Sequence, residues 1–283
     1  MGMTATPGDP QRIAILQMTS GIDPVANAQT IVQAVRNAAG EGAAMLFTPE
    51  MSGLIDRNRG RAAVHVVPEA DNPVLAKARD AAAAAGMWVA LGSLAIRRDD
   101  GRWANRSLLI DPAGAIAARY DKIHMFDVDL ASGETWRESS AYAPGEAVVT
   151  VQTPLGRLGL TICYDIRFPA LFEELGRQSC DVIAIPAAFT VPTGTAHWHL
   201  LQRARAVEAS AWVVAAAQTG HHADGRETYG HSLVIDPWGE VVLDMGSEPG
   251  LGFATIDAAR QAQVRAQLPS LANKREIPRS QQT

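Results

Sequence analysis

The sequence predicts an α/β fold: a four-layer α-β-β-α sandwich built from two similar halves, with an internal pseudo-twofold repeat. Three observations lead to this prediction. Short apolar runs alternate with helical patterns, which is typical of sheets covered by helices. A pattern of strand, loop and hairpin occurs twice, over 88–112 and again over 212–237. Of the 283 residues, 47% are hydrophobic and 19% charged, which is globular composition with ample material for a large core.

The expected elements follow the spacing of the apolar residues. The first half predicts strands over 12–17, 43–47 and 87–94, and helices over 27–39 and 72–85. The second half predicts strands over 159–163, 181–185 and 212–217, and helices over about 168–177 and 196–210. Gly40 and Gly86 follow the first two helices, where a glycine favours the C-cap.

The repeat is visible in single residues. Trp88, Asp100-Gly101-Arg102, Ser107 and Asp111-Pro112 correspond, in the same order, to Trp212, Asp224-Gly225-Arg226, Ser232 and Asp236-Pro237. Each copy ends in a hairpin with an Asp-Pro-x-Gly turn, in which Pro presets φ and Gly permits a positive φ. The alternative is chance similarity between two ordinary hairpins. Two such halves can bury their sheets against each other, which gives the sandwich.

The chain is expected to be one domain. No segment rich in Pro, Gly or Ser separates the two halves, so a single unit spans 1–283, with its core at about 12–267. Residues 268–283 are polar and contain proline, and we expect an extended or frayed tail there.

Composition excludes several classes of protein. The chain has 25 Lys and Arg against 30 Asp and Glu, a net charge of −5, and no basic run, which disfavours nucleic-acid binding. No apolar stretch approaches the roughly 18 residues of a membrane span. The first residues show no signal-peptide pattern, and two cysteines make no disulfide framework, so we expect a reducing, cytoplasmic setting.

Cys163 is the candidate nucleophile. It lies in GLTICYDIRFP, where an apolar strand leads into a turn and then a helix, a geometry that exposes a side chain beside backbone N–H groups. A thiol becomes a strong nucleophile once a base removes its proton. The alternative is an inert buried cysteine. Cys180 precedes an apolar strand without charged company and is expected in the core.

Candidate partners of this thiol carry charge. Glu50 follows the strand and turn of AMLFTPEM, where a carboxylate can act as a general base, or merely cap a helix or form an ion pair. Lys122, in RYDKIHMF, can stabilise an oxyanion, although a single lysine is more often a surface residue. Glu138 lies in the loop ETWRESS.

The histidines leave a rival arrangement open. A Cys–His dyad is the chemical alternative to Cys–Glu–Lys. His197 and His199 are two residues apart, which does not place them on one helix face, so a metal site is disfavoured. His221 and His222 are expected in a solvated loop. The sequence contains no Gly-rich phosphate-binding motif.

Taken together, these motifs resemble the nitrilase superfamily of carbon–nitrogen hydrolases. FTPEM with Glu50, YDKIHMFD with Lys122 and GLTICYDIRFP with Cys163 occur in the family's order, and Glu138 matches a second glutamate that the family uses. The resemblance implies the sandwich fold and a homodimer or larger even assembly, formed through the helices after Cys163 and around 196–209. Within the superfamily, PTGTAHWH, AAAQTGHH and YGHS look like the branch of the deaminated glutathione amidases and omega-amidases.

The resemblance also implies a mechanism without a metal or an organic cofactor. A small amide is hydrolysed through a Cys163 thioester, which releases ammonia and a carboxylate. Glu50 moves the protons, while Lys122 and the Tyr164 backbone N–H hold the oxyanion. Glu138 holds Lys122 or the substrate. A family acyltransferase would use an amine instead of water, and a catalytically inactive scaffold is disfavoured because the full set of residues is present.

The substrate follows from the same resemblance, with deaminated glutathione expected first and α-ketoglutaramate second. Both are anionic, and Arg167 could contact a carboxylate, unless it forms an ion pair within the protein. Arg226 lies on a loop that could also set specificity. The chain departs from the family pattern at Ala170 and His199, where members usually or often have glutamate, and His199 is expected near the substrate.

Overall fold

Two six-stranded sheets form the centre of the computed structural model, which describes residues 9–129, 133 and 135–278. The first sheet consists, in spatial order, of β16 (Gly250–Ile256), β1 (Gln11–Gln17), β2 (Met45–Phe47), β3 (Trp88–Arg97), β4 (Trp103–Ile110) and β5 (Ile116–Asp121). The second consists of β15 (Val241–Asp244), β14 (Leu233–Ile235), β11 (Trp212–Ala215), β10 (Val182–Ala184), β9 (Gly156–Leu160) and β8 (Val149–Thr153).

The two sheets repeat one strand pattern. In the first, β1, β2 and β3 are parallel and β4 and β5 follow antiparallel; in the second, β9, β10 and β11 are parallel and β14 and β15 antiparallel. The turns match as well. Asp111 Oδ1 accepts from the N–H groups of residues 113 and 115, and Asp236 Oδ1 accepts from those of residues 238 and 240. The predicted internal repeat is therefore confirmed, and chance similarity is excluded.

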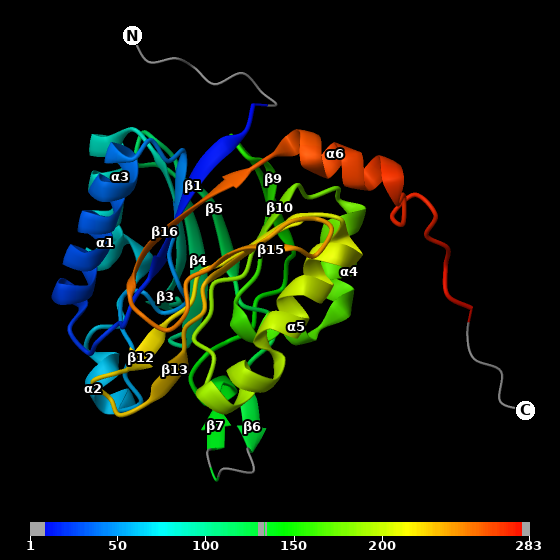
Figure 1. The fold of residues 1–283 in the computed structure, drawn as a ribbon. Helices are drawn as coiled ribbons and strands as arrows, with labels where there is room; N and C mark the ends of the chain where they lie inside the picture. The colour runs from blue at the N-terminus through cyan, green and yellow to red at the C-terminus, as the bar shows by residue number, and fades with distance from the viewer. Residues whose placement is uncertain (1–8, 130–132, 134, 279–283) are drawn as a thin grey trace, which may run out of the picture.

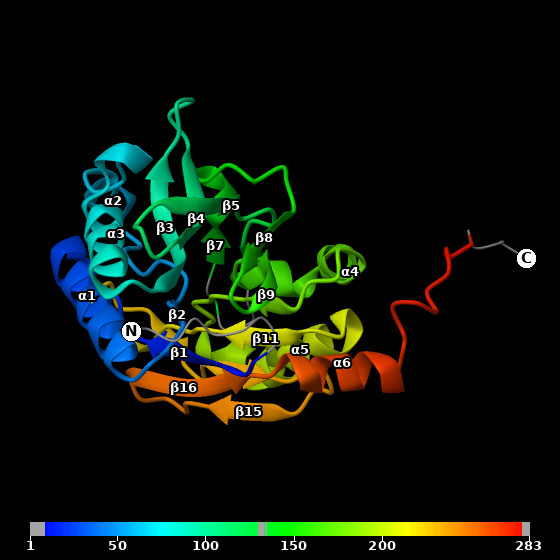
Figure 2. The ribbon, with the colours of Figure 1, turned by 90° about the horizontal axis from the view of Figure 1, so that it is seen from above.

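Helices cover the outer face of each sheet and complete the four layers (Figures 1 and 2). The helices α1 (Pro24–Gly40) and α3 (Pro73–Ala85) cover the first sheet, and α4 (Pro169–Arg177) and α5 (Val191–Ala209) cover the second. The alternating side chains of β1 explain why the sheet is covered on both faces. Ile13 and Ile15 pack with apolar residues of the second sheet, while Ala14 and Leu16 pack with α1 and α3. The predicted α-β-β-α sandwich is confirmed.

Helix ends show where sequence signals succeed and fail. Asn72 caps α3 through Leu75 N–H, and Gly86 ends it at φ 63°, as expected. The expected C-cap at Gly40 is wrong: α1 continues through Gly40 and is capped by the Glu41 N–H, and Gly42 is the residue with positive φ, at 74°. Gly40 and Gly42 are only two residues apart, so the sequence does not show which of them follows the helix, and in the structure it is Gly42.

Several short elements have no counterpart in the sequence-based expectations. They are α2 (Arg59–Ala63), β6 (Asp127–Asp129), β7 (Thr135–Arg137), β12 (Thr219–His221), β13 (Glu227–Tyr229), α6 (Ala258–Gln267) and the 3₁₀ turns η1 (Glu69–Asp71), η2 (Glu138–Ser140) and η3 (Cys163–Arg167). The longer strands β8 and β16 were not expected either. The predicted strand over 159–163 ends earlier, at Leu160, because Cys163 already begins η3. Of the expected tail, residues 279–283 lie outside the described part of the chain. No helix of the described residues is both long and apolar enough to cross a membrane.

Candidate active site

Cys163 lies at a sharp turn between β9 and α4, as its sequence context predicts. Its φ is 49°, a left-handed conformation that a residue other than glycine rarely adopts and that costs on the order of 1–3 kcal/mol. Neighbouring contacts hold the turn. The Cys163 N–H donates to the Pro186 carbonyl at 2.8 Å, and the Ile162 N–H donates to Asp165 Oδ2 at 2.9 Å. The fold thus holds the buried thiol in a strained turn.

Asp165 anchors this turn, a role that the sequence did not reveal. Its carboxylate is fully buried and accepts from the Tyr120 hydroxyl at 2.6 Å and from the His124 N–H at 3.0 Å. The His124 ring also contacts Asp165, at 2.7 Å from Nδ1 to Oδ1. His124 therefore serves the turn after Cys163 from the segment after β5, and its ring is engaged by Asp165, not by the thiol.

Glu50 follows β2 and directs its carboxylate to the same point. Its Oε1 accepts from Asn105 Nδ2 at 2.9 Å and from Lys122 Nζ at 3.0 Å, while Oε2 accepts from the Ala188 N–H at 2.9 Å. Its charge also acts on the neighbouring Cys163 thiol and raises the pKa of that thiol. Since Glu50 is only 5% exposed, its orientation is set by these partners. It caps no helix of the described residues, and the ion pair that it does form, with Lys122, is buried.

Lys122 lies between two carboxylates. Besides Glu50, its ammonium donates to Glu138 Oε2 at 2.9 Å, and that oxygen also accepts from the Phe126 N–H at 2.7 Å. Lys122 is 2% exposed. Burial acts to lower the pKa of Lys122, but the Glu138 and Glu50 charges outweigh it and hold the pKa well above its usual value. The ammonium therefore keeps its charge, and the surface-lysine alternative is excluded.

The surroundings of the Cys163 thiol favour its protonated form over the thiolate. Burial, followed by the Glu50 charge, raises the pKa of Cys163 well above that of a free thiol, and Lys122 opposes this only in part. The resting site therefore holds a neutral thiol beside a carboxylate that can take its proton. Cys180 lies in the core as expected, and burial raises its pKa to about 12.

Asn105 completes the cluster and was missed from the sequence. It lies on β4, is 1% exposed, and its Nδ2 donates to both Glu50 Oε1 at 2.9 Å and Glu138 Oε1 at 3.1 Å. One amide group thus fixes both carboxylates around Lys122. The available signal was an asparagine inside the apolar strand WANRSLLI, where a buried polar side chain requires partners.

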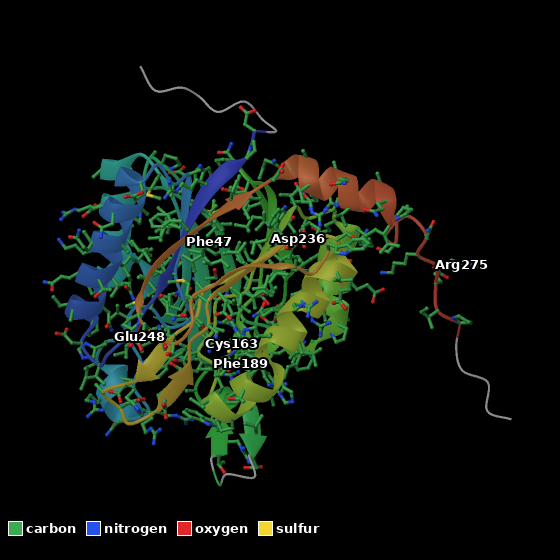
Figure 3. All side chains as sticks on the ribbon, in the orientation of Figure 1. Phe47, Cys163, Phe189, Asp236, Glu248 and Arg275 are labelled. Carbon is green, nitrogen blue, oxygen red and sulfur yellow. The ribbon has the colours of Figure 1, made fainter. Side chains whose placement is uncertain are left out.

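The cluster opens into a pocket of about 690 Å³. Its wall contains the four expected residues Glu50, Lys122, Glu138 and Cys163, and also Tyr164, Arg57, Arg167, Arg226, Trp136 and Phe189. Figure 3 shows Cys163 and Phe189 close together between the layers, above the β6–β7 hairpin.

The cations of the pocket differ in their partners. Arg226 forms an ion pair with Asp224 at 2.8 Å. Among the described residues, Arg167 has no carboxylate partner; its guanidinium lies over the rings of Tyr164 and Phe189, and Nη1 is 3.3 Å from His197 Nδ1. The alternative of an ion pair for Arg167 is therefore excluded within the described chain. The Arg57 guanidinium likewise has no carboxylate partner among the described residues, and its Cζ lies 6.0 Å from the centre of the Trp136 ring.

The structure corrects one histidine expectation. His199 is not among the residues that line the pocket; its Nε2 lies 2.9 Å from Asp244 Oδ2, and its place near the substrate stays a prediction. His221 is exposed as expected, but His222 is 4% exposed and is bonded to the Ser20 carbonyl and the Thr228 hydroxyl. The hairpin of β12 and β13 turns it inward.

Comparisons with known proteins agree with this geometry. The model of the carbon-nitrogen hydrolase family matches residues 12–266. Deaminated glutathione amidase of Yersinia enterocolitica is 39% identical over 269 residues, which are 93% of this chain and 92% of that protein.

Two solved structures share the fold. The NitFhit protein of C. elegans superposes with a TM-score of 0.88 at 35% identity, over 95% of this chain and 66% of that one. A mutant of the amidase from Nesterenkonia sp. AN1, with acrylamide added at its active-site cysteine, gives a TM-score of 0.77 at 26% identity, over 92% of this chain and 98% of that one. The chain therefore belongs to the carbon–nitrogen hydrolase family and is an enzyme that hydrolyses carbon–nitrogen bonds in amides.

Proposed function

We propose that this enzyme hydrolyses a small anionic amide through a thioester on Cys163, with deaminated glutathione as its first substrate. One arrangement carries the mechanism: Glu50 accepts from the Lys122 ammonium at 3.0 Å, and its charge raises the pKa of the neighbouring Cys163 thiol. An amide carbonyl is weakly electrophilic and ammonia is a poor leaving group. The site must therefore deprotonate a nucleophile, stabilise an oxyanion and protonate the departing nitrogen.

The steps follow from the charges of the resting site. Glu50 takes the thiol proton as sulfur attacks the carbonyl carbon, and the carbonyl π electrons move to oxygen. Lys122 and the Tyr164 N–H stabilise that oxyanion. Glu50 returns its proton to the nitrogen, the C–N bond breaks, and ammonia leaves a thioester. Glu50 then takes a proton from water as the water attacks, and returns it to the sulfur.

Glu138 and Asn105 act in this scheme as positioning residues. Glu138 accepts from the Lys122 ammonium, and the Asn105 amide donates to Glu50 and to Glu138. The acyltransferase alternative shares every step up to the thioester and differs only in its acceptor. Release of ammonia and acid without an added amine separates hydrolysis from transfer.

The charges of the pocket support an anionic substrate. The guanidinium groups of Arg57 and Arg167 line it without carboxylate partners among the described residues, whereas Lys122 is already neutralised by two glutamates. A guanidinium can hold a carboxylate through two parallel hydrogen bonds. The deaminated glutathione amidase of Yersinia enterocolitica points to the same choice, with α-ketoglutaramate as the second candidate.

Substrate preference is the test of this assignment. We expect kcat/KM to be highest for deaminated glutathione, then α-ketoglutaramate, and lowest for neutral aliphatic amides and N-carbamoyl amino acids. Arg167→Gln should raise KM for the anionic amides and leave kcat/KM for a neutral amide nearly unchanged. A preference for aliphatic or carbamoyl substrates of more than tenfold, about 1.4 kcal/mol, contradicts the substrate while leaving the mechanism intact.

The enzyme is further proposed to act as a homodimer or larger even assembly in the cytoplasm. Leu200 and Val207 on α5 are exposed by 67% and 44%, and Trp238 on the neighbouring β14–β15 turn by 48%. Because such a group of large apolar side chains is costly to leave in water, a second copy of the chain is a suitable cover. Leu201 on the same helix packs partly against the core, so α5 can contact its own sheet and a second copy at once.

Sedimentation tests this proposal. We expect a species of at least twice 30.1 kDa at micromolar concentration. Leu200→Glu should shift the protein towards the monomer because it places a charge in the apolar contact, whereas Val25→Glu, at an exposed position on α1, serves as the control. A monomer in the unchanged protein contradicts the proposal.

A further inference from the structure

A second cluster of chemically active side chains lies outside the pocket. It consists of His199 on α5, His231 just before β14 and Asp244 at the end of β15. One nitrogen of each histidine and one carboxylate oxygen of Asp244 all lie within 4.8 Å of one another. The three side chains are 37%, 27% and 35% exposed, so an ion in solution can reach them. The mechanism proposed above uses none of them.

The backbone presents His231 in a defined orientation. Its φ of 55° is left-handed, which is uncommon for a residue other than glycine. The His231 N–H donates to the Gly246 carbonyl at 2.6 Å, and its carbonyl accepts from Trp198 Nε1 at 2.7 Å. The ring stacks on Tyr229 with centroids 4.5 Å apart. These contacts direct Nδ1 to Asp244 Oδ1 at 2.9 Å.

The other two ligands converge from rigid elements. His199 projects from α5, and its Nε2 lies 2.9 Å from Asp244 Oδ2. Asp244 is held by the Gly246 N–H, which donates to Oδ1 at 2.9 Å. One carboxylate therefore faces two imidazoles that come from separate parts of the chain. Such convergence lowers the entropic cost of gathering ligands around an ion.

We propose that His199, His231 and Asp244 form a binding site for a divalent transition-metal ion of the Zn²⁺ type. Two imidazole nitrogens and one carboxylate oxygen are ligands that Zn²⁺ favours, with water completing the coordination. At metal–ligand bonds of about 2.0–2.2 Å in a tetrahedral site, ligand atoms are roughly 3.3 Å apart. The observed separations of 2.9 Å between each histidine nitrogen and the carboxylate need only a small side-chain rotation.

The charge of the site suits a dication. With neutral imidazoles, the three side chains carry one negative charge. Hydrogen bonding between Asp244 and the histidines is the metal-free alternative, and it requires a proton on each facing nitrogen. A bound ion takes the place of these two protons at the facing nitrogens, so metal and protons compete for the same atoms.

A metal titration distinguishes the two arrangements. Untagged protein, freed of metal with a chelator, is titrated with Zn²⁺ in competition with a chromophoric chelator. We expect one Zn²⁺ per chain with a Kd of micromolar or tighter. His199→Gln, His231→Asn and Asp244→Asn should each weaken binding at least tenfold. Asparagine is chosen at position 231 because it tolerates a positive φ.

The controls separate this site from other ligands. His197→Gln removes an exposed histidine of the same helix, and Cys163→Ala removes the thiol of the pocket. Both should bind Zn²⁺ as the unchanged protein does. Co²⁺ supplies a second measurement. Bound through nitrogen and oxygen, it should show visible absorption bands and lack the intense near-ultraviolet band that a thiolate ligand would add. These measurements involve no amide turnover, so their outcome is independent of the proposed function.

The proposal is overturned if the unchanged protein binds Zn²⁺ no better than at millimolar concentration. It is also overturned if binding is lost in the Cys163 or His197 variant, or survives within tenfold in all three ligand variants. Loss of binding in the ligand variants counts as support only where their thermal unfolding in chelator matches that of the unchanged protein. A variant that fails this criterion is replaced by His199→Ala, whose exposed position on α5 tolerates truncation.

Discussion

Cys163→Ala should reduce amide turnover to the uncatalysed background, while the protein folds normally. The sulfur is the atom that bonds to the substrate, and neither Glu50 nor Lys122 can replace it. In a protease that works through a comparable covalent intermediate, loss of the nucleophile costs on the order of 10⁶-fold in kcat. Alanine removes one buried atom and keeps the backbone, so the loss should appear in kcat and not in the melting temperature. Steady-state ammonia release measures the effect.

Cys180→Ala is the matched control, because Cys180 is the other cysteine of the chain and lies in the core. It should keep nearly full activity. With a slow substrate or an acylating inhibitor, mass spectrometry of the digested protein should place the adduct on the peptide that contains Cys163. An adduct elsewhere, or substantial activity in Cys163→Ala, would remove the thioester mechanism.

Glu50→Gln and Lys122→Ala should be the next most damaging changes. Glutamine cannot accept the thiol proton, and loss of a general base typically costs roughly 10²–10⁴-fold. Loss of an oxyanion donor costs roughly 10²–10³-fold. The thiol pKa adds to the first effect: burial and the Glu50 charge hold the thiol protonated, so turnover depends on transfer of that proton to a base. Single-turnover kinetics with circular dichroism of each variant separates chemistry from folding.

A matched control for the loss of the Lys122 charge removes a lysine that lies outside the pocket. Lys77→Ala, at an exposed site on α3, removes the same charge outside the pocket and should leave the rate unchanged. Glu138→Gln should also be severe, because it leaves Lys122 with one carboxylate. If Glu50→Gln or Lys122→Ala keeps more than about a tenth of the wild-type rate, the role assigned to that residue is wrong.

Long-range patterns allowed most of the fold to be predicted. The repeat of strand, loop and hairpin predicted two equivalent sheets, because the same Asp-Pro-x-Gly turn recurs where the same strand pairs must form. The short segments were not predicted. Strands β6, β7, β12 and β13 have three residues each, and a period of two is not detectable over that length.

The residues of the site also divide into those that the sequence pointed to and those that it did not. Glu50, Lys122 and Cys163 could be found because each follows an apolar strand with a distinctive turn. Asn105 and Asp165 could not, because their importance depends on contacts with residues far away in the sequence, such as Glu138 and Tyr120. The contact of His199 with Asp244 was not predicted either, since a helix position alone does not reveal which neighbour the side chain meets. The catalytic roles themselves stay predictions until the variants are measured.

Because the two halves are similar, each position proposed to be catalytic has an equivalent position in the other half. The equivalent positions carry different residues. Counted from the paired strands, Cys163 corresponds to Met18, Lys122 to Ser247 and Glu50 to Ala187. Neither half is self-sufficient, because Glu50, Lys122 and Glu138 come from the first and Cys163 and the Ala188 N–H from the second. Two fragments divided between β5 and β8 would each be inert, and activity would return only by complementation. Turnover in this enzyme thus reports the correct docking of its two sheets.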